Sequence, residues 1–314
     1  MSKSDGLTVP SALESCITAY LREKRAAGRS RETLAVYTRV IQEVVLPFCR
    51  QSGITEPGQL GARELSALSA GLLDGTRSRS GRSLSMPSVA SYARTITVFL
   101  EWLTKQGETV SSRVQKPRLP KRVVDVLSRE DIRALEDAAP TERDKLIVRI
   151  LADTGVRLGE LLTADSLRQE PDRKWYLKVR GKGDKERMVP IQPRLATRID
   201  RYARRTRKES PNDRLFLGNR RSARTGEYEP LTGSGAEQTI RDLGEEVLRR
   251  RVYPHLFRHS FVTQQARQGM HPLLVAKIVG HESMAMINEV YAHLETSDAH
   301  DALMKSLLSQ DPER

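Results

Sequence analysis

The sequence is short of cysteine and lacks any long apolar run. Only Cys16 and Cys49 are present in 314 residues, too few and at the wrong spacing for a zinc cage or a disulfide framework, and we expect both to be buried in helices. No segment approaches the ~18 uninterrupted apolar residues of a membrane span. The first ten residues, MSKSDGLTVP, lack the apolar core of a signal peptide. These absences predict a cytoplasmic protein with no membrane partner.

Acidic residues are outnumbered by basic residues in both halves of the chain. The formal net charge is +13 and the isoelectric point is about 9.9. Residues 1–120 hold 17 Lys and Arg against 10 Asp and Glu, and residues 121–314 hold 36 against 30. This balance favours a polyanionic partner, so we expect both halves to touch the same nucleic acid in a nucleoid-associated protein. A basic protein that binds no nucleic acid remains the alternative.

The first third of the chain has apolar residues at helical spacing. Four runs share this period, and their apolar residues are Leu13, Ile17 and Tyr20; Leu34, Tyr37, Ile41, Val44 and Phe48; Leu65, Leu68 and Leu72; and Val89, Tyr92, Ile96, Phe99 and Trp102. They predict a small all-helical domain over residues 8–108. The loop DGTRSRSGRS before the fourth run cannot pack, but its Arg77, Arg79 and Arg82 are suited to follow a phosphate backbone.

A basic stretch with two prolines and no periodicity, residues 109–125, predicts a linker between two domains. Beyond it, Ser128 and Asp131 have the spacing of a capping box and open a helix. Helical patterns dominate residues 126–298, except that KWYLKVR and KERMVPI around the turn GKGD predict a β-hairpin. Residues 299–314 predict an amphipathic tail helix. The expected fold class is therefore mainly α with a small β-hairpin or sheet.

Four separated stretches carry residues with chemical potential. In chain order they are TGVRLGEL with Arg157, GKGDKER with Lys182, HLFRH at residues 255–259, and VGHESMAMINEVYAHL with His281 and Tyr291. This order resembles the tyrosine recombinase (phage integrase) family, whose site combines Arg, Lys, His-x-x-Arg, His or Trp, and Tyr. Each motif alone is weak, whereas their joint occurrence in order is specific. The resemblance covers most of the chain, because the N-terminal helices are similar to the family's four-helix, SAM-like core-binding domain.

The resemblance implies that Tyr291 attacks a DNA phosphodiester and forms a covalent 3′-phosphotyrosine. The attack spreads negative charge over the phosphoryl oxygens, which guanidinium groups neutralise well because they stay protonated and present forked donors. Arg157 and Arg258 are the candidates for this clamp. A tyrosine with an ordinary pKa near ~10 needs help to attack at neutral pH. His255, one helical turn from Arg258, can accept its proton or donate to a phosphate oxygen.

The remaining site residues have assisting roles. Lys182 is expected to protonate the leaving 5′-hydroxyl as a general acid, and His281 to donate to a phosphoryl oxygen. Glu160 resembles the family's acidic partner of the first arginine, and His259 matches a family position without a clear chemical task, so both are assigned supporting roles. We expect no metal, ATP or other cofactor, because arginine and histidine supply the charge and the phosphotyrosine bond retains the energy of the cut bond.

Several alternatives remain open for single residues. Arg157 can be a helix-start arginine that merely pairs with Glu160, and Lys185 rivals Lys182. Tyr291 is one of eight tyrosines, and most tyrosines on helices pack in cores. Either a DNA contact or a solvated surface is expected for three consecutive arginines, Arg249, Arg250 and Arg251.

The leading functional hypothesis is a site-specific recombinase that acts on double-stranded DNA. As the resemblance implies, a dimer would occupy each site and a homo-tetramer would hold two sites. The first alternative is a type IB-like topoisomerase, which also uses a tyrosine and an arginine clamp. The second is a regulator that grips DNA without cutting it. A metal-dependent nuclease is disfavoured, because the histidines lack paired carboxylates at ligand spacing and the sequence has no HExxH.

Overall fold

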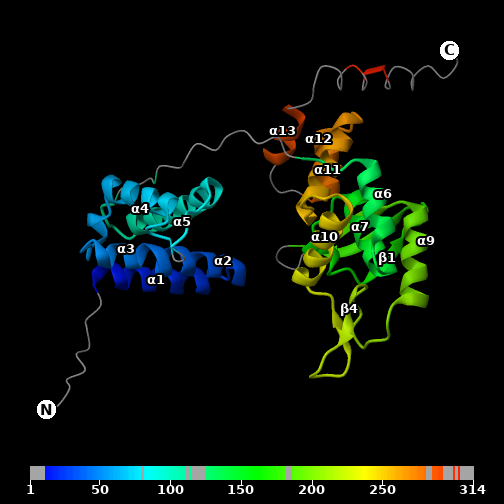
Figure 1. The fold of residues 1–314 in the computed structure, drawn as a ribbon, viewed down its shortest axis with the longest axis horizontal. Helices are drawn as coiled ribbons and strands as arrows, with labels where there is room; N and C mark the ends of the chain where they lie inside the picture. The colour runs from blue at the N-terminus through cyan, green and yellow to red at the C-terminus, as the bar shows by residue number, and fades with distance from the viewer. Residues whose placement is uncertain are drawn as a thin grey trace. The chain divides into compact units, whose positions relative to one another are not determined.

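The structure, a computed structural model, divides the chain into two compact units, residues 1–122 and 123–314 (Figure 1). The division falls within residues 109–125, where the sequence predicts a linker. No helix in the described ranges is long and apolar enough to cross a membrane. The residues that the structure describes are 11–78, 81–110, 114, 125–181, 186–280, 285–292, 300 and 303–304.

The regular elements in the described part of the first unit are all helices, joined by loops. Its α-helices are α1 (Ala12–Ala26), α2 (Arg31–Tyr37), α3 (Leu46–Gln51), α4 (Ala62–Asp74) and α5 (Met86–Lys105). A π-helical segment, Thr38–Val45, joins α2 to α3 without a break, and a 3-10 turn spans Pro57–Gln59. Residues 31–51 therefore form one long helical segment, which coincides with the second apolar run of the sequence.

An aromatic cluster fills the core of the first unit. The Tyr20 ring centroid lies 5.0 Å from that of Phe99 and 5.5 Å from that of Trp102, both in edge-to-face geometry. Trp102 Nε1 donates a hydrogen bond to Glu23 Oε2 at 2.6 Å. These contacts tie α5 to α1 at the centre of the unit.

The two cysteines differ in burial. Cys49 is buried in α3, whereas Cys16 in α1 is only partly buried, so the expectation of two buried thiols is wrong for Cys16. The buried face of α1 is formed by Leu13, Ile17 and Tyr20. Cys16 packs at the edge of this face, where helical geometry leaves one side of the side chain open.

The second unit is mostly helical with two small antiparallel sheets. Strands β1 (Ser166–Gln169), β2 (Trp175–Arg180) and β3 (Glu186–Ile191) form one sheet in that order, and β4 (Leu217–Arg221) pairs with β5 (Tyr228–Pro230) in the other. This confirms the mainly α fold with small sheets. The helices are α6 (Arg129–Ala138), α7 (Glu142–Thr154), α8 (Leu158–Leu161), α9 (Pro193–Arg201) with a π-helical continuation (Tyr202–Thr206), α10 (Gly233–Val247), α11 (Pro254–Arg267), α12 (Pro272–Val279) and α13 (Ala285–Ala292).

The predicted β-hairpin is formed by β2 and β3. The two strands pair from Trp175 opposite Ile191 to Arg180 opposite Glu186. The sequence pattern did not predict the β4–β5 hairpin, which projects from the unit (Figure 1). Its strands, LGNRR and YEP, have no apolar alternation, and their register is irregular. Tertiary pairing rather than local preference therefore makes these strands.

Helix α11 packs against α7 and α12 and carries the HLFRH motif into the interior. Phe257 is fully buried there. Ser260 Oγ accepts a hydrogen bond from the backbone N–H of Leu127 at 2.7 Å, which fixes α11 to the entry of α6. That entry has the predicted capping box between Ser128 and Asp131. The helix that bears three candidate site residues, His255, Arg258 and His259, is thus held both by its packing and by the hydrogen bond between Ser260 and Leu127.

Candidate active site

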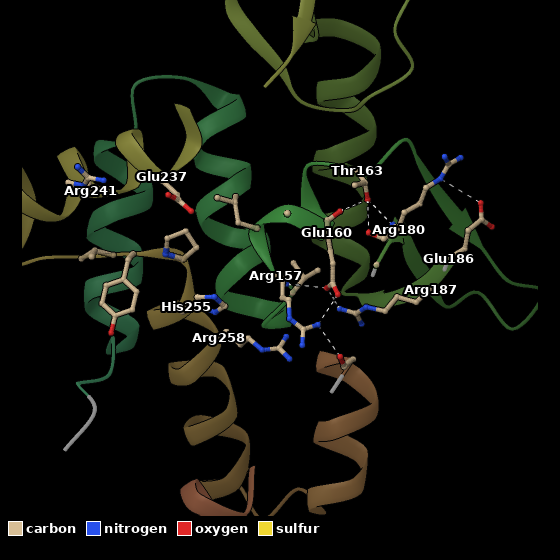
Figure 2. Close-up of a pocket in the computed structure, with 18 of the residues that line it drawn as sticks. Arg157, Glu160, Thr163, Arg180, Glu186, Arg187, Glu237, Arg241, His255 and Arg258 are labelled. Atoms are coloured by element: carbon tan, nitrogen blue, oxygen red, sulfur yellow. Dashed lines mark hydrogen bonds and ion pairs between the residues drawn. The ribbon is translucent and has the colours of Figure 1, made fainter. Parts of the chain in front are cut away.

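A hollow of about 1070 Å³ opens on the second unit. It lies between the α7–α8 turn, β2 and β3, α10, the start of α11 and the end of α12 (Figure 2). Arginines predominate over carboxylates in its wall, so the hollow favours an anion. Within the described part of the chain, no three His, Cys, Asp or Glu side chains gather as metal ligands. The charged and polar lining residues are Arg157, Glu160, Thr163, Arg180, Glu186, Arg187, Glu237, Arg241, Arg251, Tyr253, His255 and Arg258.

Arg157 stands at the start of α8, where the chain turns out of α7. Gly155 ends α7 with a φ of 60°, and a Cβ there would lie 2.7 Å from the ring of Phe261, so only glycine fits this turn. The backbone N–H and Nη1 of Arg157 donate to the Glu160 carboxylate at 3.3 and 2.9 Å. Nη1 also donates to the Gly280 carbonyl at 3.1 Å. The ion pair therefore forms, and it holds a side chain that is still 38% exposed.

Arg258 lies inside α11 with only 3% of its surface exposed. Its Nη1 donates to the carbonyls of Gly155 and Val279, both at 2.7 Å. Its Nη2 is buried and has no hydrogen-bond acceptor among the described residues. Burial and the charge of Arg157 lower the pKa of Arg258 to about 10, so the group stays cationic at neutral pH. A buried cation with an unused donor is costly, and an anionic oxygen in the hollow would relieve that cost.

His255 lies one helical turn before Arg258 on the wall of the hollow (Figure 2). The His255 side chain is exposed to solvent, but the surrounding protein still desolvates the imidazole and lowers its pKa. The charges of Arg258 and Arg157 lower the pKa further, against an upward effect of Glu237. The imidazole is therefore neutral near pH 7, and a neutral imidazole can accept a proton. His259 is partly buried and is not among the described lining residues.

Glu160 is held between two arginines. Arg187 Nη2 donates to its Oε2 at 2.7 Å, while Arg157 donates to Oε1. Burial raises the pKa of Glu160, but the hydrogen bonds and charges of Arg187 and Arg157 outweigh burial, and the net shift is downward. Glu160 is therefore ionised. Sequence reasoning missed Arg187, whose only signal is its place in the same GKGDKER motif as Lys182.

Tyr291 is not among the described residues that line the hollow. It lies on α13, partly buried against the apolar cluster that includes Phe261 and Val275. Its hydroxyl donates a hydrogen bond to the Met270 carbonyl, and burial raises its pKa. In this structure the predicted nucleophile is thus a protonated phenol held by a backbone carbonyl. Arg157, His255 and Arg258 are brought together, whereas Tyr291 is not.

The DNA-contact candidates of the first unit have different surroundings. Arg82 is exposed. The Arg77 guanidinium lies 5.2 Å from the Phe48 ring centroid and donates to Gln51 Oε1, so this side chain is partly committed to the protein. Arg79 lies outside the described residues, as do two candidates of the second unit, Lys182 and His281.

The three consecutive arginines of the second unit also differ in their surroundings. Arg249 is exposed, and Arg251 lines the hollow. Arg250 donates to Asp125 and, at 2.7 Å, to Asp131. Its guanidinium therefore anchors the entry of α6, which favours a structural role over the predicted DNA contact.

Comparison with known proteins shows which family the chain belongs to. The Phage integrase family model matches residues 125–298, more than half of the chain. Tyrosine recombinase XerA from Pyrococcus furiosus is 27% identical over 289 residues, which cover 90% of this chain and 91% of that protein.

Two solved structures, both below 25% identity, share the fold. XerH recombinase in a pre-cleavage complex with difH DNA has a TM-score of 0.61 at 19% identity, over 90% of this chain and 83% of that chain. The Tn1549 transposon integrase with transposon right-end DNA has a TM-score of 0.65 at 16% identity, over 93% and 99% of the two chains. The family match spans every described residue of the hollow. The chain therefore belongs to the phage integrase family, the tyrosine recombinases.

Proposed function

We propose that this protein is a site-specific DNA recombinase that cuts and rejoins strands through a covalent 3′-phosphotyrosine, without metal or ATP. The observation that carries the proposal is the buried Arg258 guanidinium, whose Nη2 lacks an acceptor in the described hollow that Arg157 and His255 share. A phosphodiester group of DNA brings non-bridging oxygens and one negative charge. It therefore supplies what this arrangement of donors lacks.

The proposed reaction is a transesterification. The Tyr291 oxygen attacks phosphorus, the bond to the 5′-oxygen breaks, and the 3′-phosphate stays esterified to tyrosine. Arg157 and Arg258 neutralise the charge that develops on the non-bridging oxygens, and neutral His255 accepts the phenol proton. A 5′-hydroxyl from another strand then attacks the phosphotyrosine, which rejoins DNA and releases Tyr291.

Other residues complete the proposal on motif evidence. Lys182 would give the leaving 5′-oxygen its proton, and His281 would donate to a phosphoryl oxygen. Glu160 would orient Arg157, consistent with their hydrogen bond of 2.9 Å, and His259 would support the helix that carries His255.

The hydrogen bond of the Tyr291 hydroxyl to Met270 sets a condition on the reaction. The Tyr291 hydroxyl must leave the Met270 carbonyl and approach the phosphorus atom before its oxygen can attack. We therefore propose that α13 changes position on DNA binding. This step is consistent with the short length of α13, because a helix of about two turns has little surface with which to hold its place.

The proposed partner is a double-stranded recombination site. Residues 8–108 would grip it as a core-binding domain, joined by the linker of residues 109–125 to a catalytic domain of residues 126–298. One dimer would occupy each site and a homo-tetramer would bring two sites together. Most of residues 299–314 lie outside the described residues. We propose that they form a tail helix that either docks into a neighbouring protomer of this assembly or folds back on its own domain. The assembly would be nucleoid-associated.

A trapped covalent adduct tests the proposed function. On a nicked suicide substrate that carries its own site, the wild-type protein should form a protein–DNA adduct, and Tyr291→Phe should form none. Tyr253→Phe is the matched control, because Tyr253 lines the hollow and is expected to keep most of the activity. An adduct that persists in Tyr291→Phe and vanishes in Tyr253→Phe would move the nucleophile to Tyr253.

Two further outcomes separate the alternatives. Relaxation of supercoiled DNA that contains no recombination site would favour a topoisomerase. Site-specific binding without any adduct in the wild-type protein would favour a non-cleaving regulator.

A further inference from the structure

The Arg187 side chain caps the C-terminal end of α12. The last carbonyls of a helix have no partner within the helix, and a cation near them is favourable because the helix dipole is negative there. Arg187 Nη1 donates to the Ile278 carbonyl at 2.7 Å, and Nη2 donates to the Val279 carbonyl at 3.3 Å. Nη2 also donates to Glu160 at 2.7 Å. One side chain of β3 therefore joins α8 to α12, and Figure 2 shows its contact with Glu160.

The two clamp arginines share the partners of Arg187. Arg258 donates to the Val279 carbonyl at 2.7 Å, so one carbonyl accepts from both arginines. Arg157 binds the same Glu160 carboxylate that Arg187 binds. Arg187 thus shares a hydrogen-bond partner with each arginine of the clamp: Glu160 with Arg157, and the Val279 carbonyl with Arg258.

Gly280 leaves little room for Arg187 to shift. It ends α12 with a φ of 67°, and a Cβ at this position would lie 2.8 Å from both Cζ and Nε of Arg187. The guanidinium therefore packs directly on the backbone at the helix end. A shorter or differently shaped side chain at 187 cannot fill the same space.

We propose that Arg187 is a positioning residue of the recombination site: it fixes Glu160 and the α12 carbonyls where they aim Arg157 and Arg258 into the hollow. The inference rests on the proposed function, because this aim matters only if both arginines bind the scissile phosphate. Nη1 and Nη2 of Arg187 both donate to the protein itself, whereas its Nε is buried without an acceptor among the described residues. Because both ends of the guanidinium are engaged, we assign Arg187 a role that acts through Arg157 and Arg258, although it also lines the hollow.

The geometry requires an arginine rather than any cation. A guanidinium presents its donors in a planar fork, and Arg187 uses the fork toward a carboxylate and two carbonyls at once. A lysine keeps the charge but has a single nitrogen on a flexible stem, which cannot span these partners. Arg187→Lys therefore keeps the positive charge but removes the hydrogen bonds that position Glu160 and the α12 carbonyls, so it tests the two contributions separately.

The first measurement is single-turnover adduct formation by the full chain on the suicide substrate. In Arg187→Lys the rate should fall on the order of 100-fold, the usual effect of a small misplacement of catalytic groups, while DNA affinity stays close to that of the wild type. Lys174→Gln is the control. Lys174 lies just before β2, the strand that pairs with β3, and it forms an ion pair with exposed Asp172. A wild-type rate in Arg187→Lys would overturn the inference, since charge alone would then suffice.

A double-mutant cycle tests whether Arg187 acts through Glu160. If it does, Arg187→Lys combined with Glu160→Gln should be no slower than the slower single variant, because both changes break the same connection. Independent, multiplying effects would contradict this route.

Amide hydrogen exchange of residues 276–280 in the DNA-free protein gives a readout that needs no activity. Exchange should be faster in Arg187→Lys than in the wild type and unchanged in Lys174→Gln, with melting temperature showing that all variants are folded. Unchanged exchange in Arg187→Lys would overturn the inference even if recombination occurs. Faster exchange, with no adduct from the wild type, would reject the proposed function and leave the tie to α12 standing.

Discussion

Burial and charge conflict at Arg258. Its guanidinium is 3% exposed, and its described hydrogen bonds go to carbonyls rather than to a carboxylate. Leaving a buried charge without a charged partner is costly. An anionic ligand would supply the missing partner, and Arg258 lines the hollow in which such a ligand could lie.

At this scale we predict that Arg258→Ala slows adduct formation by about 100- to 1000-fold, the usual cost of removing one donor to a developing oxyanion. DNA affinity should fall much less, because it depends mainly on the total number of cations near the phosphates. Rates on the suicide substrate and affinities by titration measure the two effects.

Arg204→Ala is the control for the loss of one positive charge, because Arg204 is 77% exposed and pairs with Asp200. It should leave the cutting rate unchanged. A collapse of DNA affinity in Arg258→Ala alone would mean that this arginine anchors DNA more than it assists the reaction.

At the scale of elements, the end of α12 is the place where the parts of the site meet. Arginines from β3, from the N-cap of α8 and from α11 all donate to its last carbonyls or to Gly280. A change in the position of this helix end therefore reaches both clamp arginines. The backbone at Gly280 is as much a part of the site as the side chains.

We predict that Gly280→Ala destabilises the protein and slows adduct formation. An L-residue at a φ of 67° costs about 1–2 kcal/mol, and the added Cβ must also push the Arg187 guanidinium away. The free energy of unfolding and the single-turnover rate are the quantities to measure.

Gly226→Ala separates these two effects. Gly226 has a φ of 71°, and a Cβ added there would meet nothing within 4 Å, so this variant carries the backbone cost without the collision. It should lose a similar free energy of unfolding from the backbone but keep the wild-type rate. Equal slowing in both variants would show that loss of stability, not displacement of Arg187, limits the reaction.

At the scale of the whole molecule, the positive charge is spread over both halves of the chain. A polyanion that spans both units would gain from this distribution, and its binding would weaken with salt through counterion release. Not every arginine contributes, since the Arg250 guanidinium is occupied by Asp125 and Asp131.

We therefore predict that Arg82→Gln and Arg249→Gln each reduce the slope of log affinity against log salt by about 1, as expected for one phosphate contact. Arg250→Gln should instead lower the melting temperature, because it leaves two carboxylates without their cation. Salt titrations of DNA binding, together with thermal melts, distinguish the three. A reduced slope in Arg250→Gln with an unchanged melt would favour a DNA contact for this residue after all.

Local patterns in the sequence were sufficient for much of the fold. The capping box of Ser128 and Asp131 and the β2–β3 hairpin are short-range features, set by residues a few positions apart. The order of the Arg, Lys, His-x-x-Arg, His and Tyr motifs was sufficient for the family. The polar β4–β5 hairpin was not predicted, because its strands depend on contacts that no apolar alternation announces.

The sequence alone determined which side chains carry the groups that the proposed cleavage needs, namely guanidiniums, imidazoles and a phenol, because those groups belong to the side chains themselves. Folding settled which of them meet. Arg187 reaches Ile278, 91 residues away, and Arg157 reaches Gly280, 123 residues away. The Tyr291 hydroxyl is held by Met270, outside the described lining of the hollow. Such contacts arise from the packing of distant segments, and no periodicity or spacing along the chain encodes them.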